Sequence, residues 1–392
     1  MDMPKASIRV LPSLSEIAPQ AWDACAAGGA GRPEPFVSHA FLYALEEAGC
    51  VSARAGWMPQ HLVLDGEDGP AAVAPSYLKS HSRGEYVFDQ GWADAFERAG
   101  GAYYPKVQVA VPFTPVTGRR LLTRDPDDIA RAAALAAGLG ELVRLRQASS
   151  AHVTFATEAE WEHLAEMGFL KRTDSQFHWI NEGYGSYDDF LAALASRKRK
   201  ALKRERREAL ENGITIEWLT GADITEAAWD AFFTFYMDTG ARKWGHPYLN
   251  RQAFSLIGER LADQVLLVIA KRAGRYVAGA LNFIGADTLY GRYWGATEHH
   301  PFLHFELCYH QAMDYAIAHK LGRVEAGAQG EHKLARGYLP HPTYSAHFIA
   351  HAGLRQAVAQ FLERERAAVA EDAAILTDLG PFRRCADMDE TD

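Results

Sequence analysis

The sequence predicts an α+β (mixed α/β) fold built from two tandem copies of one unit, and three observations lead to this prediction. The chain has 392 residues, which is long for one hydrophobic core and suits two domains of about 150–200 residues. A fourteen-residue phrase occurs twice, as MGFLKRTDSQFHWI at 167–180 and RGYLPHPTYSAHFI at 336–349. A strand-rich stretch also recurs, at 61–92 and 266–296. Repeats this far apart indicate domain duplication, because solenoid repeats are much shorter.

The first elements of each copy form a predicted meander. Runs of Val, Leu and Ile bounded by Gly and Asp at 61–92 and 266–296 are typical of antiparallel strands and hairpins. The third strand of each meander is rich in aromatic residues and ends near Trp92 or Trp294.

The later elements follow the same order in both copies. In the second copy a helical stretch follows over 302–320, where apolar residues recur at helical spacing. A short strand comes next, at 152–156 and 322–326, and the repeated phrase closes each copy. We therefore expect one unit over 1–185 and another over 186–392, each a mostly antiparallel sheet flanked by helices.

A strongly basic helix is predicted at the start of the second unit, over 190–213. It ends at Asn212-Gly213, a helix-terminating pair. Eight of the eleven residues in RKRKALKRERR (197–207) are Lys or Arg, and only Glu205 opposes them. Solvated helices usually mix charge signs, so a phosphate-rich partner is one explanation and a plain solvated face is the other. The residues expected to contact phosphate are Arg199, Lys200 and Lys203.

The bulk composition restricts the class of protein. Apolar residues make up 48% and charged residues 23% of the chain, and the net charge is −9, which disfavours a general nucleic-acid coat protein but allows a local basic patch. The four cysteines are far apart and form no CxxC pair, so neither a disulfide framework nor a zinc-thiolate site is indicated. No signal peptide or membrane-spanning stretch is visible. We expect a cytoplasmic protein.

The polar residues are concentrated just before the second copy of the phrase. EAGAQGEHKLARGY (325–338) follows a predicted strand, whereas the equivalent first-copy stretch has no Lys or Arg before Phe169. A general base beside hydrogen-bond donors and cations suits acyl transfer to an amine, since the base removes the amine proton and a cation stabilises the oxyanion. A polar surface turn is the alternative. The residues of interest here are Gln329, Glu331, His332, Lys333, Arg336 and Tyr338.

Three further sets of residues are possible site components. FYMDTGARKWGHPYL (235–249) combines cations with an aromatic residue in a Gly-flanked loop, and YLKSHSRGEYVF (77–88) is its first-copy analogue in chemistry. Glu306, on a helix that is apolar on one side, could be a buried base. The histidines at 299–310 contain no HExxH spacing, so we expect no metal site. The residues that these sets contribute as substrate contacts are Arg242, Lys243, Trp244, Lys79, Ser80 and Tyr86, and the adjoining stretch YYPKVQVAVPFTPV (103–116) adds Lys106.

These motifs resemble a known family. LKSHSRGEYVFD, YYPKVQVAVPFTPVTGRRLL, TGARKWGHPYL, LHFELCYHQA and VEAGAQGEHKLARGYLP are similar to motifs of the FemAB-like family of predicted bacterial N-acyltransferases, over roughly 5–385. The order of elements resembles two GNAT acyltransferase units in tandem. Wider Fem relatives transfer amino acids from aminoacyl-tRNA to an amine of a peptidoglycan precursor, and their second unit also opens with a basic segment. The resemblance therefore implies an acyltransferase of the GNAT superfamily.

The expected reaction is direct attack of an amine on an acyl or aminoacyl group. Glu306 or Glu331 would act as the base, with His332 as an alternative base or orienting group. Lys333 or Arg336 would hold an oxyanion or a carboxylate. Gln329, Tyr338 and Ser345 would contact substrate.

The acyl donor is left open by the sequence. GNAT proteins that use acetyl-CoA usually carry a Q/R-x-x-G-x-G/A loop, whose backbone N–H groups hold the pyrophosphate. The equivalent stretch here, GATEHHPFLHFEL (295–307), lacks that pattern. Aminoacyl-tRNA is therefore the first expectation for the donor, acyl-CoA the second, and no tightly bound cofactor is expected. The acceptor would be an amine-bearing small molecule, a peptide or a cell-wall precursor. A non-catalytic protein that binds RNA or such a precursor is a third possibility.

Overall fold

The computed structural model describes residues 7–243, 247–328 and 330–383, and the side chains of 240–243 and 331 lie outside this description. Its contacts group the chain into two compact units. The first unit consists of Met1–Asp174, Tyr248–Ile257 and Pro342–Val369. The second consists of Ser175–Pro247, Gly258–His341 and Ala370–Asp392. These units interleave in sequence, whereas a boundary at 185 would divide the chain into contiguous halves.

Two sheets form the first unit. One is antiparallel, with the order β1-β3-β4-β7, and consists of Ile8–Leu11, His61–Gly66, Gly69–Ala74 and Leu122–Thr123. The other has the order β15-β8-β6-β5-β2, and all its pairs are antiparallel except β6–β8, which is parallel. Its strands are β2 (Trp57–Pro59), β5 (Ser76–Lys79), β6 (Lys106–Val109), β8 (Ser150–Ala156) and the end of β15 (Leu339–Ile349).

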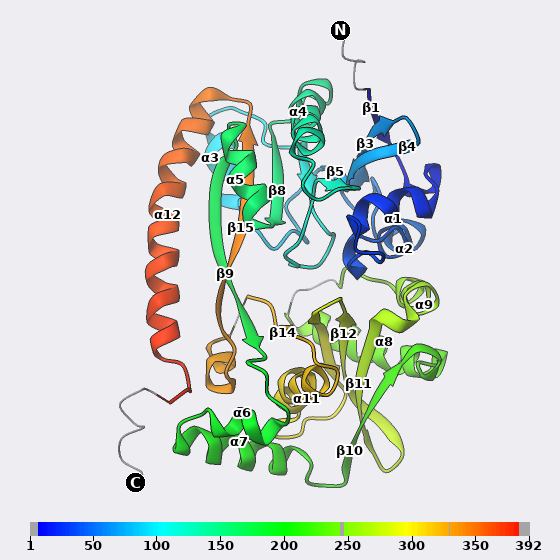
Figure 1. Ribbon diagram of the computed structural model, residues 1–392, viewed down its shortest axis with the longest axis vertical. Coiled ribbons are helices and arrows are strands. Elements are labelled where there is room, and N and C mark those ends of the chain that lie inside the picture. Colours follow the sequence, from blue (N-terminus) through cyan, green and yellow to red (C-terminus); the bar gives the residue numbers. More distant parts are fainter. Residues whose placement is uncertain (1–6, 244–246, 329, 384–392) are drawn as a thin grey trace. The chain divides into compact units, whose positions relative to one another are not determined.

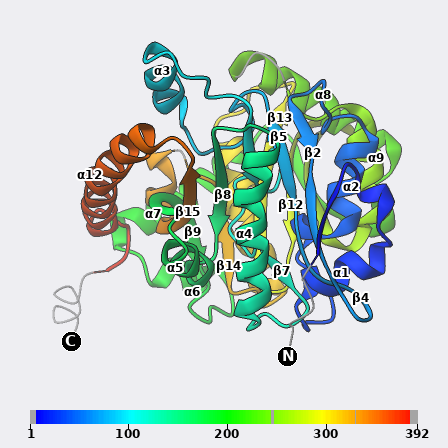
Figure 2. The ribbon, with the colours of Figure 1, turned by 90° about the horizontal axis from the view of Figure 1, so that it is seen from above.

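The helices of the first unit cover these sheets. Helix α4 packs on strands of both sheets (Figure 2). The core beneath it includes Leu135, Leu139 and Val153. The helices are α1 (Pro19–Ala27), α2 (His39–Glu47), α3 (Gln90–Arg98), α4 (Ile129–Leu145) and α5 (Glu158–Glu166), with short 3₁₀ turns η1 (Leu14–Glu16) and η2 (Pro35–Val37). Two further helices, α9 (Arg251–Arg260) and α12 (Ala352–Asp378), begin in the first unit and end in the second.

The second unit contains one sheet with the order β10-β11-β12-β13-β14-β9. All of its strands except β13 are labelled in Figure 1. Every pair is antiparallel except β13–β14, which is parallel. The strands are β10 (Ile214–Thr220), β11 (Val265–Arg272), β12 (Arg275–Ile284), β13 (Thr288–Ala296), β14 (Arg323–Glu325) and the end of β9 (Leu170–Ile180).

Helices pack on this second sheet as well. Helix α8 lies on β12 and β13, and α11 contacts β13 and β14. The helical elements are α6 (Tyr187–Ala192), α7 (Ser196–Ala209), α8 (Glu226–Lys243), α10 (Leu303–Phe305), the π-helical turn η5 (Glu306–His310) and α11 (Gln311–Ala318). The 3₁₀ turns are η3 (Gly221–Asp223), η4 (Ala262–Gln264) and η6 (Glu331–Arg336).

The two units share a strand order and exchange their last strands. In the first unit β5 pairs antiparallel with β6, β6 pairs parallel with β8, and β15 completes the sheet. In the second unit β12, β13 and β14 repeat this order, and β9 completes the sheet. The glycines of the repeated phrase, Gly168 and Gly337, both have left-handed φ angles, of 89° and 82°, and each precedes one of the exchanged strands. The predicted duplication of a mixed α/β unit is therefore confirmed, and the end of each copy of the phrase lies in the other unit.

Two sequence predictions of elements differ from the structure. The aromatic strand expected to end near Trp92 is absent, because Trp92 lies inside α3 and the strand equivalent to β13 is β6. The single helix expected over 190–213 is interrupted between α6 and α7. There Leu194 forms a β-bridge with Phe382, and the Ala195 N–H donates to the Pro381 carbonyl. Contacts with the chain's last described residues therefore override local helix propensity.

Candidate active site in the second unit

The candidate site lies where the parallel strands β13 and β14 separate. They pair only from Thr288 to Tyr290 on β13, opposite Arg323 to Glu325 on β14. Strand β13 continues to Ala296, whereas β14 ends at Glu325. The separation leaves room for a cavity of about 110 Å³. It is lined by Ala280, Leu281, Asn282, Gly291, Arg292, Tyr293, Trp294, His304, Cys308, Tyr309 and Ala326.

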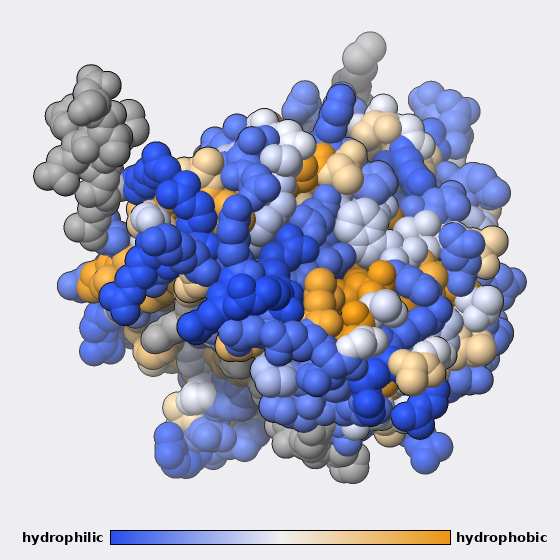
Figure 3. All heavy atoms as spheres, turned by 90° about the horizontal axis from the view of Figure 1, so that it is seen from below, coloured by the Kyte–Doolittle hydropathy of each residue, from blue (hydrophilic) through white to orange (hydrophobic). Residues whose placement is uncertain are grey.

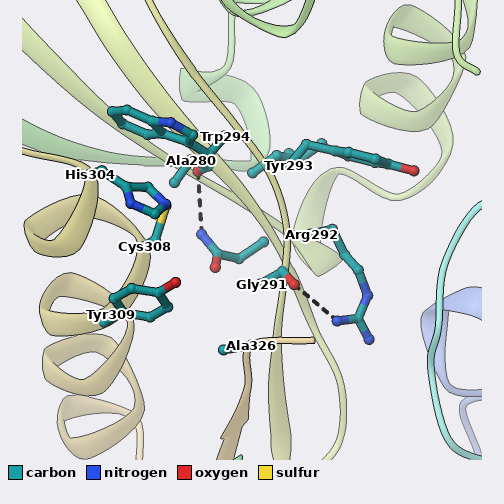
Figure 4. Close-up of a pocket in the computed structure, with 11 residues that line it drawn as sticks. Ala280, Gly291, Arg292, Tyr293, Trp294, His304, Cys308, Tyr309 and Ala326 are labelled. Atoms are coloured by element: carbon teal, nitrogen blue, oxygen red, sulfur yellow. Dashed lines mark hydrogen bonds between the residues drawn. The ribbon is translucent and has the colours of Figure 1, made fainter. Parts of the chain in front are cut away.

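Four elements supply the polar and aromatic lining, one of them being β12, which contributes Asn282. His304, Cys308 and Tyr309 come from α10 and η5, while Arg292 and Trp294 come from β13, and Figure 4 shows the two groups on separate elements around the cavity. His304 and Cys308 are one helical turn apart and so face the same side. Cavity-lining residues on a π-helical turn are consistent with the frequent occurrence of such turns at functional sites.

A β-bulge on β13 shapes the cavity wall. Leu281 lies opposite Tyr293 and Asn282 opposite Gly291, so Arg292 is an extra residue on β13. The Arg292 guanidinium lies 3.1 Å from a Glu325 carboxylate oxygen, and both side chains are buried. This ion pair joins the two strands at the point where their backbone pairing ends. At Gly291 an added Cβ would come within 3.3 Å of the Glu325 carbonyl oxygen, so a side chain here would crowd the junction.

Lys333, on η6, lies beside this cavity. Its ammonium group donates to the carbonyl oxygen of Gly327, at 3.1 Å, one residue beyond the lining residue Ala326. Burial lowers the pKa of Lys333 to about 8; nearby Cys308 opposes this shift and Arg292 adds to it. A buried amine with so low a pKa is typical of functional sites.

His332 and Arg336 of η6, and Tyr338 just after it, contact α10 and the π-helical turn. His332 is exposed, and its Nε2 lies 2.9 Å from the hydroxyl of Tyr309. Arg336 is buried, with its guanidinium 3.5 Å from the centre of the Phe305 ring. Tyr338 is fully buried and donates to the Tyr309 carbonyl at 3.2 Å. His332, Lys333, Arg336 and Tyr338 thus contact residues in or next to the cavity wall, but none of the four lines the cavity itself.

Glu306 has a different environment from the one the sequence suggested. Its carboxylate is fully buried and lies 2.8 Å from the Arg206 guanidinium. The side chain of Gln311 also donates to it, at 2.7 Å. Glu306 does not line the cavity. It is two positions from His304 and two from Cys308, and residues two apart on a helix face different sides. Glu306 anchors α7 and does not meet Lys333 in the cavity.

Helix α7 places its charged residues on two sides. Glu205 pairs with Arg336 at 2.5 Å and with His310 at 2.7 Å, and Arg206 pairs with Glu306 and Asp314. The predicted phosphate contacts face outward: Lys200 and Lys203 are exposed and Arg199 is half-buried. Lys203 makes an exposed ion pair with Asp188 at 2.9 Å. The face of the molecule on the side of α6 and α7 is predominantly hydrophilic in Figure 3.

The site residues expected from the first copy lie in the other unit. Lys106 is buried, 2.6 Å from a Glu85 carboxylate oxygen and in contact with Asp89. Lys79 is also buried, 3.6 Å from the centre of the Trp57 ring, and burial lowers its pKa to about 7. Both lysines therefore belong to a closed ionic cluster.

The remaining first-unit residues are not part of that cluster. Ser80 is exposed and Tyr86 is half-buried with a left-handed φ of 60°. Ser345 lies on β15 in the first unit, where its hydroxyl accepts from the Phe155 N–H at 3.3 Å. Trp244 and Gln329 lie outside the described residues, as do the side chains of Arg242, Lys243 and Glu331.

Several cavity residues escaped the sequence-based reasoning. Asn282 and Arg292 are polar residues inside apolar strands, and this interruption is the signal that could have identified them. Cys308 and Tyr309 gave no such signal, because half-apolar helices are common in protein cores. In the described part of the chain, no three His, Cys, Asp or Glu side chains group as a metal site would require. Within the same residues, no helix is long and apolar enough to cross a membrane.

Comparison with known proteins identifies the class of protein. The chain matches the FemAB-like family, described as peptidoglycan biosynthesis/recognition, over residues 13–384. It therefore belongs to the FemAB-like family, as the sequence motifs indicated. A search of curated protein sequences finds no match.

Solved structures support the fold. The structure is similar to that of FemX, with a TM-score of 0.56, 13% identity and coverage of 88% of this chain and 98% of FemX. It also resembles the C-terminal domain of a predicted lysylphosphatidylglycerol synthetase from Agrobacterium fabrum, with a TM-score of 0.55, 10% identity and coverage of 90% and 97%. A tandem GNAT protein of clavulanic acid biosynthesis aligns at a TM-score of 0.47, with 11% identity and coverage of 88% and 98%. The first two similarities extend over nearly the whole of each compared chain and so support a shared overall fold.

Proposed function

We propose that the protein transfers an acyl or aminoacyl group onto an amine, with the reaction centre at the cavity of the second unit. The observation that carries this proposal is the buried Lys333 beside a cavity of about 110 Å³ at the separation of two parallel strands. Membership of the FemAB-like family supports the same reaction class. The cavity is large enough for an acyl group of a few heavy atoms, because a cavity of roughly 150 Å³ holds benzene.

The chemistry follows from the groups around the cavity. The acceptor amine attacks the acyl carbonyl, and Lys333 as a cation stabilises the oxyanion that forms. His332, exposed and hydrogen-bonded to Tyr309, takes the proton of the attacking amine. The bond from the acyl carbon to the donor's oxygen or sulfur then breaks, and His332 returns its proton to that atom, so the donor leaves as an alcohol or a thiol. Glu331 is the alternative base; Glu306 is unsuited to this role because Arg206 neutralises it.

The donor that we favour is aminoacyl-tRNA, with acyl-CoA as the alternative. The exposed basic face of α7 supports a phosphate-rich donor, since lysine and arginine side chains neutralise phosphate well. No tightly bound cofactor is needed for the proposed steps. The family description supports a peptide or cell-wall precursor as the amine acceptor, although a small amine is compatible with the same chemistry. Because both donors are cytoplasmic metabolites, we assign the reaction to the cytoplasm.

The test is a transfer assay with the purified chain. Aminoacylated total tRNA and a set of acyl-CoA thioesters serve as donors, and cell-wall peptides with a free amine serve as acceptors. We expect Lys333→Ala to lower kcat by about 100- to 1000-fold, as removal of an oxyanion donor typically does. Lys271→Ala is the matched control, because Lys271 belongs to the same unit and its partner Glu217 lies 2.6 Å away on the surface. Full activity of Lys333→Ala would refute the proposed centre, and tRNA binding without any transfer would favour the non-catalytic alternative.

A further inference from the structure

Asn282 is a polar side chain in an apolar part of the second sheet. It is 1% exposed, and a buried amide is costly unless its polar atoms have partners. Its nitrogen donates to two main-chain carbonyl oxygens, those of Leu266 at 3.4 Å and Ala280 at 3.3 Å; the second bond is drawn in Figure 4. These two acceptors fix the orientation of the amide, because the opposite orientation would place oxygen against oxygen.

The amide oxygen of Asn282 is directed to the cavity wall. It lies toward Gly291, where an added Cβ would be 3.4 Å from it, and both residues line the cavity. Among the residues that the structure describes, none donates a hydrogen bond to this oxygen. The cavity thus offers a buried acceptor that a ligand with an N–H or O–H group would satisfy.

We propose that Asn282 determines which acyl group the cavity accepts, by accepting a hydrogen bond from an amino group on that acyl group. This assignment rests on the proposed function and deepens it, since it selects aminoacyl donors over plain acyl donors such as acetyl. Trp294 and Tyr309 line the same cavity, and aromatic faces attract an ammonium group. The same chemistry applies whether the aminoacyl group arrives on the 3′ end of a tRNA or on coenzyme A.

The selectivity follows from the unpaired acceptor. A plain acyl group would fill the cavity and exclude water while leaving the Asn282 oxygen without a donor. Leaving a buried polar group unpaired typically weakens binding by about 10- to 100-fold, and sites built to bond a substrate N–H or O–H reject analogues that lack it. An acyl group with a hydroxyl in place of the amino group should bind between the two.

The experiment measures binding of stable donor analogues to the full-length chain. Acetyl, glycolyl and glycyl groups are attached as amides to 3′-amino-3′-deoxyadenosine, which represents the tRNA end, and to the amine analogue of coenzyme A. We measure the dissociation constant of each analogue by titration calorimetry. In at least one series, the glycyl analogue should bind on the order of 10- to 100-fold more tightly than the acetyl analogue. Asn282→Leu should abolish this preference. Thr288→Val should retain it, because Thr288 is buried in the same sheet but does not line the cavity.

The possible outcomes test the role of Asn282 and the proposed acyl transfer separately. Equal affinity for acetyl and glycyl analogues in the wild type, or a glycyl preference that survives in Asn282→Leu, would overturn the role of Asn282 while leaving acyl transfer intact. If neither series binds the wild type, the proposed function fails and this assignment fails with it. Should Asn282→Leu not fold, Asn282→Ala replaces it with the same criteria. The two donor series distinguish a tRNA donor from a coenzyme A donor.

Discussion

Two features of the surroundings of Lys333 bear on its charge. It is almost fully buried, which disfavours its charged form, and its ammonium has a main-chain carbonyl as partner. Burial lowers the pKa of Lys333 to about 8, with Cys308 opposing this shift and Arg292 adding to it, so the cation predominates at neutral pH and the neutral amine above about pH 8. An oxyanion-stabilising role requires the cation.

This titration predicts the upper limb of the pH profile. Below its pKa Lys333 is protonated and active, and above about pH 8 kcat/KM should fall tenfold per pH unit as the neutral amine replaces the cation. Lys333→Arg keeps a charge at all these pH values, so its lower residual activity should show no such fall near pH 8. The measurement is kcat/KM against pH for both proteins, and an unchanged upper limb in Lys333→Arg would assign that limb to another group.

The site residues were predictable in part, and the reasons are physical. The run from Glu331 to Arg336 concentrates base and cation types in a short segment, so their proximity to each other follows from the sequence alone. The Glu306–Arg206 ion pair joins side chains from distant parts of the chain, and no local pattern reveals it. The same holds for Arg292 and Glu325, which meet only because β13 and β14 pair.

At the scale of elements, α7 divides its charges between two functions. Glu205 and Arg206 point inward and fasten the helix to η5 and η6 through His310, Glu306 and Arg336. In the described residues, Lys198 and Lys200 are exposed and have no ion-pair partner. The outward face is therefore available for an anionic partner, while the inward pair fixes the position of the helix.

Charge reversal on the outward face tests this division. Replacing Arg199, Lys200, Lys203 and Arg204 together by Glu should abolish tRNA binding and leave the thermal unfolding midpoint nearly unchanged, since these side chains are exposed or half-buried. In the wild type, binding should weaken steeply with salt. Filter binding across a salt series is the measurement. Indifference of binding to both salt and the reversal would leave α7 as a plain solvated face.

A contrasting variant on the inward face serves as the control. Arg206→Ala removes the partner of two carboxylates, one of them fully buried. Leaving a buried charge unpaired costs about 3–5 kcal/mol, so this variant should lower the free energy of unfolding. The basic composition of α7 was evident from the sequence, but which of its charges face inward was not, because Glu205 and Arg206 find their partners on η5, η6 and α11.

At the scale of the whole molecule, duplication and exchange of the last strand determine the architecture. The repeated phrase predicted two similar units, and the strand order bears this out. The exchange itself was not predictable, because the pattern of a strand specifies its buried face and leaves open which sheet it joins. Residues 344–349 of β15 pair with β8 and so complete a sheet whose other first-unit strands lie between residues 57 and 156.

The exchange predicts how fragments behave. A fragment of residues 1–185 lacks β15, which leaves the edge of β8 unpaired and exposes buried residues such as His152, whose Nδ1 lies 2.7 Å from that of His347. We expect this fragment not to unfold cooperatively in urea. A version in which residues 336–369 follow it through a flexible linker should recover a cooperative transition. A single sharp transition in fragment 1–185 alone would contradict the expectation.

The exchanged strand also has a consequence during synthesis on the ribosome. The edge of β8 is made by residue 156, but its partner strand is complete only at residue 349. At about 5–20 residues per second, that edge waits roughly 10–40 s for its partner. Unpaired strand edges invite association with other chains, so the nascent protein has a long interval in which a chaperone could protect it. If translation ends before residue 339, the released product lacks β15, and the edge of β8 in its first unit stays unpaired.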